Sequence, residues 1–264
     1  MQETLMQLLT EIDSLKKTSK YQLIDDGINQ AVDVIRKRLE EVQGKEEKKK
    51  DKLLISIIGP IAAGKSTFCK VLQELNPDKI GVFKEDIEGY LELVNLYYND
   101  PLVYTAPFQL FMICRKMINI YSATVESEYP INVIERTCDE NRDIFAKNRY
   151  DNGFSSDKAW KEYSTFLKMV NPVIPQPNFY IYLTGKPNFL LERIRNQRKR
   201  AGEEMITLEY MKSIDILYNQ WIIQKQKENC YVYKININRN LIPEEMNEHF
   251  WRSIKKYQEK GCEV

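Results

Sequence analysis

A glycine-rich loop carries the clearest chemistry in this sequence. Residues 59–67 read Gly-Pro-Ile-Ala-Ala-Gly-Lys-Ser-Thr, the pattern GxxxxGK[ST], between an apolar run and a helical pattern. The two glycines let the backbone curl so that its N–H groups and the following helix N-terminus point at phosphate oxygens. The lysine can reach the β- and γ-phosphates of a nucleotide, and the serine can bind Mg²⁺. The sequence therefore predicts a nucleotide phosphate site formed by Gly59, Ala62, Ala63, Gly64, Lys65, Ser66 and Thr67.

Charged residues end two further apolar runs. Glu85 follows residues 79–83, and Glu135 and Arg136 stand at the end of residues 131–135. A carboxylate such as Glu85 can take a proton from an attacking hydroxyl. Glu135 is a candidate partner of Mg²⁺, and Arg136 can hold anionic oxygens. The alternatives are an acid that complements a helix N-terminus for Glu85 and a structural ion pair for Glu135 and Arg136.

A strongly basic segment lies in the last third of the chain. Five cations occur within the eight residues 193–200, and Glu203 and Glu204 follow them. A solvated helix face usually intersperses its charges, so we interpret residues 195–206 as a mobile lid that closes cations over transferring phosphates. The alternative is an ordinary solvated helix face.

The elements that must position these residues alternate between strands and helices. Strands are predicted at 53–58, 79–83, 131–135, 179–183 and 231–237. Helices are predicted at 65–75, 86–98, 106–127, 139–147, 157–169, 187–199, 207–227 and 243–259. Thr105 and Pro107 favour a helix start at 106–127. The alternation predicts an α/β fold with a five-stranded parallel sheet between helices.

The N-terminal 50 residues have a helical pattern without the alternating strands of the rest of the chain. Residues 1–43 have helical spacing, with a two-heptad seam at 28–42, and residues 44–52 contain no apolar side chain. We place a domain boundary here, between an N-terminal helical extension (1–50) and a catalytic domain (51–264). The extension either self-associates or packs as a helical hairpin on its own domain.

Composition excludes several classes of protein. The 39 basic and 38 acidic residues give a net charge of +1, so no general nucleic-acid or membrane-surface binder is predicted. The longest apolar stretch is too short to span a bilayer, and no signal peptide is evident. Because the sequence has a single histidine, His249, we do not expect a Ser-His-Asp triad or a metal site made of several histidines. Five cysteines without CxxC spacing are typical of free cytosolic thiols, so we expect a cytoplasmic protein.

Taken in order, the motifs resemble those of the deoxynucleoside kinases of the deoxycytidine, deoxyguanosine and mitochondrial thymidine kinase type. The resemblance covers roughly residues 53–242 and includes the phosphate loop, Glu85, the Glu-Arg-Thr of 135–137 and LERIRNQRKRAGEEMITLEY at 191–210. It implies a three-layer P-loop kinase fold, ATP and Mg²⁺ as cofactors, a small-molecule deoxynucleoside as acceptor, and a homodimer.

The resemblance also implies residue roles. Glu85 matches the general base that activates the 5′-hydroxyl, Arg136 the arginine beside that hydroxyl, and Glu135 the acid near Mg²⁺. Phe108, Gln109 and Phe145 match a base-binding set, Tyr98 and Glu204 a pair at the 3′-hydroxyl, and Arg198 and Arg200 the lid arginines. Asn238, Arg239 and Asn240 match the loop at the donor adenine, and Lys116 and Asn141 the positions that tune base choice.

This sequence departs from the family pattern at several positions. Asp86 replaces the proline after the base, Tyr90 a tryptophan, and Thr137 a serine. The lid carries about one extra residue, so Glu203 and Glu204 could exchange roles. Lys116 only donates hydrogen bonds whereas Asn141 donates and accepts them, which favours a purine or broad specificity.

We therefore predict ATP-dependent 5′-phosphorylation of a deoxynucleoside. One alternative is a thymidylate-like nucleoside monophosphate kinase, which would need a further cation such as Lys84, Lys116 or Arg142 for the acceptor phosphate. Another is a non-catalytic binding or assembly subunit on a kinase fold, although Lys65 and Glu85 are intact.

Overall fold

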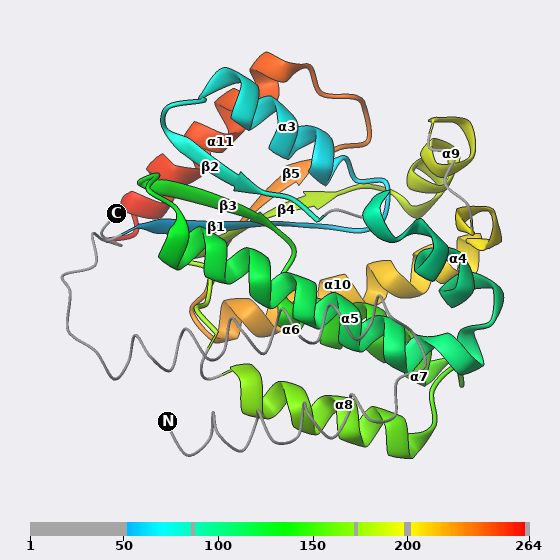
Figure 1. Cartoon of the computed structure of the whole chain (residues 1–264). Helices are drawn as coiled ribbons and strands as arrows, with labels where there is room; N and C mark the ends of the chain where they lie inside the picture. Colours follow the sequence, from blue (N-terminus) through cyan, green and yellow to red (C-terminus); the bar gives the residue numbers. More distant parts are fainter. Residues whose placement is uncertain (1–51, 86–87, 172–173, 198–201, 262–264) are drawn as a thin grey trace.

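The computed structural model describes residues 52–85, 88–171, 174–197 and 202–261. Its centre is one sheet with strand order β2-β3-β1-β4-β5, in which every pairing is parallel (Figure 1). The strands are β1 (Leu53–Ile58), β2 (Ile80–Phe83), β3 (Ile131–Glu135), β4 (Phe179–Thr184) and β5 (Tyr231–Asn236). The predicted five-stranded parallel sheet is confirmed.

Strand β1 forms the middle of the sheet because all six of its residues are apolar or small and can be buried. All six are buried, and β1 pairs with β3 on one side and β4 on the other. The register sets Ile57 opposite Glu135, so the ends of β1 and β3 lie side by side. The functional residues that follow these two strands are thereby brought to one edge of the sheet.

Helices cover both faces of the sheet. In Figure 1, α3 and α11 lie on one face and α5 and α10 on the other, with α8 outside α5. The helices are α3 (Lys65–Leu75), α4 (Leu91–Asn99), α5 (Pro101–Tyr121), α6 (Cys138–Glu140), α7 (Lys147–Asp151), α8 (Asp157–Val170), α9 (Pro187–Gln197), α10 (Leu208–Lys227) and α11 (Pro243–Gln258). Short helical turns are η1 (Glu88–Tyr90), η2 (Ser122–Glu126), η3 (Asn141–Ala146) and η5 (Glu203–Met205). The fold is a three-layer α/β/α sandwich, as predicted.

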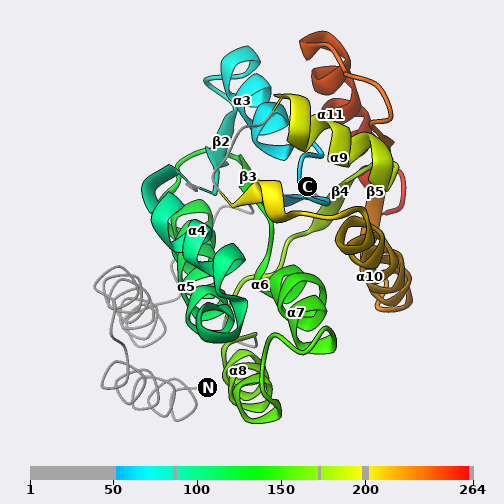
Figure 2. The same cartoon turned by 90° about the vertical axis from the view of Figure 1, so that its right-hand side faces the viewer.

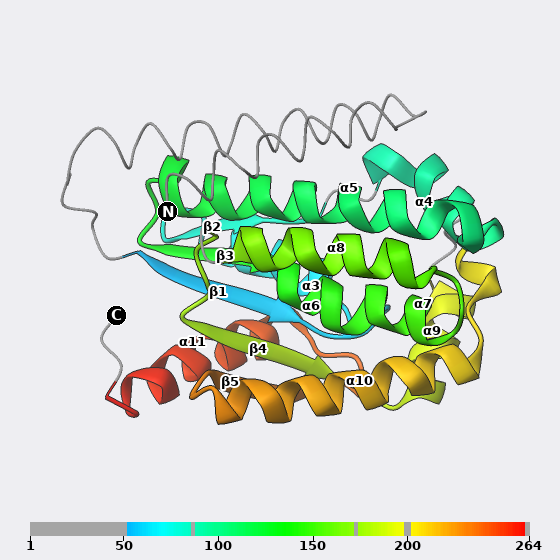
Figure 3. The same cartoon turned by 90° about the horizontal axis from the view of Figure 1, so that it is seen from below.

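Two apolar clusters hold the layers together. One joins the sheet to α3, α9, α10 and α11, and the other joins α4, α5 and α8 to the face of the sheet that α5 covers. In Figure 3, α5 and α8 lie side by side. The carboxyl ends of the strands face α4 and α9, on the side of the molecule that Figure 2 presents.

Helix α5 begins earlier than predicted. It starts at Pro101, and Pro107 lies inside it. Pro101 occupies the first helical position, where a missing N–H costs nothing. Pro107 deprives the carbonyl of Val103 of its helical donor, and Val103 is exposed, so water can serve that carbonyl.

The helix predicted at 139–147 is a composite. It consists of α6, the π-helical turn η3 and α7, and it continues to Asp151. A π-helical turn changes the directions of the side chains within a helix and is frequent at functional sites. The predicted N-terminal extension at 1–50 and the lid arginines fall outside the described residues. None of the helices that the structure describes is both long and apolar enough to cross a bilayer.

Candidate active site

The phosphate loop joins β1 to α3, and its backbone depends on glycine. Gly59 has φ +148°, and a Cβ added there would lie 2.5 Å from the carbonyl oxygen of Leu183. Gly64 has φ +87° and stands directly before α3. Both positions therefore favour glycine. Gly59 has no space for a side chain, and both residues adopt a backbone conformation that L-residues avoid.

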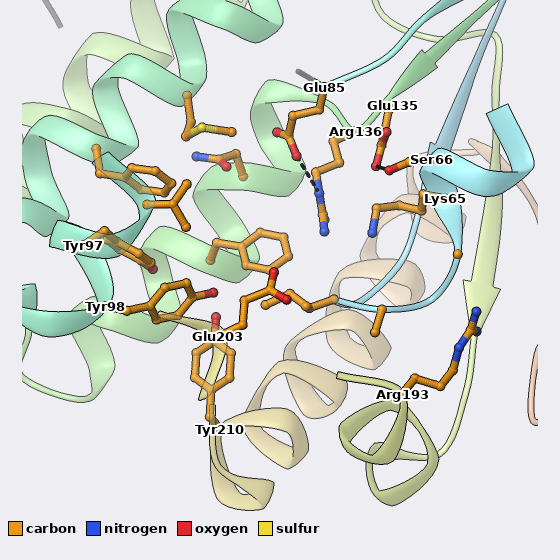
Figure 4. Close-up of a pocket in the computed structure, with 18 of the residues that line it drawn as sticks. Lys65, Ser66, Glu85, Tyr97, Tyr98, Glu135, Arg136, Arg193, Glu203 and Tyr210 are labelled. Atoms are coloured by element: carbon orange, nitrogen blue, oxygen red, sulfur yellow. Dashed lines mark hydrogen bonds and ion pairs between the residues drawn. The ribbon is translucent and has the colours of Figure 1, made fainter. Parts of the chain in front are cut away.

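The loop's own carbonyls hold the lysine in this structure. Lys65 is 4% exposed, and its Nζ donates hydrogen bonds to the carbonyl oxygens of Gly59 at 3.0 Å and Pro60 at 2.9 Å. The next side chain contacts the end of β3, since the Ser66 hydroxyl donates to Oε1 of Glu135 at 3.0 Å. Figure 4 shows these groups together on one side of a pocket.

Glu135 presents an oxygen that suits a cation. Its Oε2 atom is buried and accepts no hydrogen bond from the described residues. Burial and the charge of Glu85 raise its pKa, and the charge of Lys65 opposes that shift. A hydroxyl and a carboxylate are the hard oxygen ligands that Mg²⁺ takes when nucleotide phosphates and water complete its shell. The pair Ser66 and Glu135 therefore fits a magnesium ion.

Glu85 sits across the pocket from the phosphate loop, between two cations. It forms an ion pair with Lys116, and its Oε2 lies 3.6 Å from Nε of Arg136. The side chains of Lys116 and Glu85 are 2% and 7% exposed. Burial opposes ionisation of Glu85, but the charges of Lys116 and Arg136 outweigh it, so the pKa of Glu85 lies below its ordinary value.

Arg136 links the pocket wall to a buried polar network. Its backbone adopts φ +69°, and its Nη1 donates to Oε1 of Glu140 at 2.9 Å and to the hydroxyl of Tyr218 at 3.0 Å. The guanidinium also lies 4.4 Å from the centre of the Phe145 ring. Burial opposes its charge, yet Tyr218, Glu140 and Glu85 raise its pKa. Arg136 is therefore a fixed cation that also faces the pocket.

The pocket has a volume of about 330 Å³, near the lower end of the range for small-molecule sites. On one side, Tyr97 and Phe108 stack with ring centres 4.2 Å apart. At its inner end, Nδ2 of Asn141 donates to Oε1 of Gln109 at 2.7 Å and to the hydroxyl of Tyr163 at 3.2 Å. Aromatic walls with amides at the end suit a flat heterocycle with hydrogen-bonding edges.

The pocket lining draws on residues from the phosphate loop, the ends of β2 and β3, and helices on both sides of the cleft. It consists of Ile61, Ala62, Gly64, Lys65, Ser66, Thr67, Glu85, Val94, Tyr97, Tyr98, Phe108, Gln109, Met112, Glu135, Arg136, Asn141, Phe145, Arg193, Gln197, Glu203 and Tyr210. A phosphate-binding loop, a carboxylate facing it and an aromatic cleft thus share one cavity.

Residues 55–258 match the sequence model of the deoxynucleoside kinase family. The chain belongs to the deoxynucleoside kinase family. It is 27% identical over 201 residues to a deoxyguanosine kinase of Dictyostelium discoideum, covering 74% of this chain and 68% of that protein. It is also 27% identical over 186 residues to a deoxyadenosine/deoxycytidine kinase of Bacillus subtilis, covering 70% and 82%. Human deoxycytidine kinase is 25% identical over 233 residues, covering 78% and 88%.

Membership of this family makes the protein a kinase and sets aside the interpretation as a non-catalytic subunit. Most residues to which the resemblance gave a role lie in the kinase's pocket. Of the predicted phosphate-loop residues, Gly59 and Ala63 stand behind the lining rather than in it. Arg198 and Arg200 lie outside the described residues.

Of the two acids that could exchange roles, the structure brings Glu203 and not Glu204 into the pocket. Glu204 is exposed, whereas Glu203 is 5% exposed and lines the pocket beside Tyr98 and Tyr210. Gly202 has φ +83° and turns the chain into η5, so that the first acid of the pair points inward (Figure 4).

Two other predicted sites have partners within the protein in this structure. Lys116 does not line the pocket near the base, because the Glu85 carboxylate attracts it more strongly than a neutral ring edge would. Asn238 accepts a hydrogen bond from the backbone N–H of Lys186 at 2.7 Å, and Arg239 pairs with Glu245 at 2.8 Å. Residues 238–240 follow β5 and are not part of the lining of this pocket, and their contact with the donor adenine stays a prediction.

Sequence reasoning missed several pocket residues, among them Arg193, Tyr97 and Tyr210. Arg193, in α9, faces the phosphate loop, and its Nη2 lies 3.5 Å from the place a Cβ on Gly64 would take. It belongs to the basic segment, which was the available signal. Tyr97 precedes the predicted Tyr98, and Tyr210 stands in the helical pattern after the lid. Their pocket positions follow from how α4 and α10 pack, which no local pattern revealed.

Proposed function

We propose that this kinase transfers the γ-phosphoryl group of ATP to the 5′-hydroxyl of a deoxynucleoside. The observation that carries the proposal is the position of Glu85, which faces Lys65 and Ser66 across one pocket with Arg136 at its side (Figure 4). The reaction needs a proton acceptor, an anion-binding loop and a cation between them. All three are present within the same cavity.

On the donor side, the phosphate loop and α3 bind the triphosphate. Lys65 exchanges the carbonyls of Gly59 and Pro60 for the β- and γ-phosphate oxygens. Ser66 and Glu135 would hold Mg²⁺, which, when bound, neutralises phosphate charge. No cluster of three or more metal-ligating side chains occurs in the described part of the chain, so substrate oxygens would complete the shell. Arg193 faces the same loop.

On the acceptor side, Glu85 accepts the proton of the 5′-hydroxyl as that oxygen attacks phosphorus. The lowered pKa keeps Glu85 ionised at neutral pH. Arg136 steadies the charge of the transferring group, and its own ion pair with Glu140 keeps it in place. Positioning these groups before the reaction is the main source of rate in phosphoryl transfer.

The base lies among Phe108, Tyr97 and Phe145 in this proposal, and its edge faces the amides of Gln109 and Asn141. Both amides donate and accept hydrogen bonds, and Lys116 does not reach this end. A neutral, two-amide end accepts more than one base, which supports a broad or purine-favouring specificity. The relatives are named for deoxyguanosine and for deoxyadenosine and deoxycytidine, so more than one base occurs as substrate among them.

A nucleoside monophosphate as acceptor is less consistent with the site. Its phosphate would need a further cation, and the candidates are engaged or distant. Lys116 is paired with Glu85, Arg142 is paired with Asp143 at 2.5 Å, and the Lys84 side chain is exposed. Comparing each deoxynucleoside with its own monophosphate as acceptor distinguishes the two functions.

The decisive measurement is steady-state turnover with ATP, Mg²⁺ and a panel of four deoxynucleosides and their monophosphates. We expect deoxynucleoside monophosphates as products, with more than one base accepted. Folded protein that phosphorylates none of the deoxynucleosides would contradict the proposal. Faster turnover of a monophosphate would favour the alternative acceptor.

We further propose a cytoplasmic homodimer that takes part in nucleotide salvage. The balanced charge and the absence of a disulfide among the described cysteines Cys69, Cys114, Cys138 and Cys230 are consistent with a reducing compartment. Light scattering of the full chain measures its mass in solution. A monomer at micromolar concentration would contradict the dimer.

A further inference from the structure

The carbonyl of Gly59 receives two donors in this structure, and only one of them is the lysine. Lys65 Nζ lies at 3.0 Å, and the hydroxyl of Tyr218, from α10, lies at 2.7 Å. Gly59 and Tyr218 are both buried, and the tyrosine is 0% exposed. A hydroxyl from a distant helix thus contacts the backbone of the phosphate loop.

The same hydroxyl has two further neighbours. It contacts Oε1 of Glu140, and Arg136 Nη1 donates to it at 3.0 Å. A tyrosine hydroxyl carries one hydrogen, so Tyr218 can donate to Gly59 or to Glu140 but not fully to both. Whether Gly59 or Glu140 receives this hydrogen depends on the other donors that contact each of them.

Glu140 does not depend on that hydrogen. Its Oε1 also accepts from Arg136 Nη1 at 2.9 Å and faces the N–H of Gly59 at 3.4 Å, and its Oε2 accepts from the N–H of Thr137 at 3.2 Å. The Gly59 carbonyl has only the lysine and the tyrosine as donors in the described residues. If Lys65 moves away, the Glu140 carboxylate keeps its other donors, whereas the Gly59 carbonyl has only the Tyr218 hydroxyl left in the described part of the chain.

Binding of a triphosphate removes one of those donors. This argument rests on the proposed function, in which Lys65 leaves the loop carbonyls for the phosphates. A buried carbonyl that loses its donor disfavours that step unless another donor is in place. We propose that the Tyr218 hydroxyl is a switching donor, which turns from Glu140 to the Gly59 carbonyl when Lys65 moves to the nucleotide phosphates.

Tyr218 is then a positioning residue, since it acts on the reaction through Lys65 and the loop. It also connects the donor and acceptor sides, because Arg136 holds the same hydroxyl. The switch strengthens the binding of ligands that attract Lys65, such as ATP. It does not affect the binding of AMP, which has no β- or γ-phosphate. This difference between two adenine nucleotides is the signature of the proposal.

The test is calorimetric binding of ATP and of AMP to the full chain and to Tyr218→Phe. We expect the Kd of ATP to rise about tenfold, the loss of one buried hydrogen bond, while the Kd of AMP stays unchanged. The matched control is Tyr182→Phe, whose ring stacks on Tyr218 at 5.3 Å but whose hydroxyl is not part of this network. Thermal melting checks that each variant is folded.

Two further variants keep the proposal testable if Tyr218→Phe does not fold. Glu140→Gln weakens the competing acceptor, so the ratio of the ATP Kd to the AMP Kd should fall, opposite in sign to the effect of Tyr218→Phe. In a Lys65→Met background there is no lysine to release, so adding Tyr218→Phe should not change the ATP Kd further.

The outcomes separate this inference from the proposed function. If the wild-type protein binds ATP better than AMP and Tyr218→Phe changes both equally or neither, the switch is wrong and the kinase proposal stands. A wild-type protein that does not prefer ATP to AMP would overturn the donor site and the switch together.

Discussion

The ammonium group of Lys116 contacts the carboxylate of Glu85 in the interior of the protein, 31 residues away along the chain. Both side chains are nearly inaccessible, and Arg136 approaches the same carboxylate from the other side. The proposed general base is therefore held by two cations. In this arrangement Lys116 favours the ionised form of Glu85. Its ammonium group is then not available to contact a nucleobase.

Replacing Lys116 should change the pH dependence of the reaction. In Lys116→Met, burial of Glu85 is opposed only by Arg136 and, more weakly, by Lys65, so its pKa rises. The ionised base is then lost at a higher pH, and the acidic limb of kcat/KM should move up by about one pH unit. Lys116→Arg keeps the charge and should behave like the wild type. Superimposable profiles of Lys116→Met and the wild type between pH 5 and 8 would contradict this.

Glu85→Gln should abolish turnover while ATP still binds. Loss of a general base lowers the rate by about a hundredfold or more. The single variant leaves the Lys116 charge buried without its partner, which destabilises the fold. The double variant Glu85→Gln with Lys116→Met removes both charges and should fold while remaining inactive. Turnover of either variant within a few-fold of the wild type would rule out the role as base.

The two adjacent acids of η5 should differ sharply. Glu203→Gln should raise the KM for a deoxynucleoside about tenfold, because in the proposed function this buried carboxylate accepts a hydrogen bond from a sugar hydroxyl. Glu204→Gln should have no effect, since that side chain is exposed. With a 2′,3′-dideoxynucleoside the difference between Glu203→Gln and the wild type should disappear. A larger effect of Glu204→Gln would restore the assignment made from the sequence.

Glu135 should set the requirement for magnesium. Glu135→Gln removes the charge of a buried carboxylate whose Oε2 has no donor among the described residues, so more Mg²⁺ should be needed for half-maximal turnover at constant ATP. Glu248→Gln, in a surface ion pair of α11, is a control of the same chemistry and should leave the requirement unchanged. Equal magnesium curves for both variants would argue against Glu135 as a partner of the ion.

The sequence by itself determined the phosphate loop and the edge of the sheet where the chemistry lies. The loop is a local pattern in which Gly59 and Gly64 set the backbone whatever surrounds it. Glu85 and Arg136 could be placed near it because parallel strands end at the same edge. Both conclusions need only chain direction and short-range geometry.

Only the tertiary structure decided the partners of the side chains. Lys116 could have faced the base or the carboxylate, and the packing of α5 against β2 and β3 selected Glu85. Tyr218 reached Gly59 across 159 residues of sequence. Glu203 took the inward position because of one glycine turn. Such contacts depend on ångström-scale orientation between elements distant in the chain, and the spacing of residues along one element carries no information on that orientation.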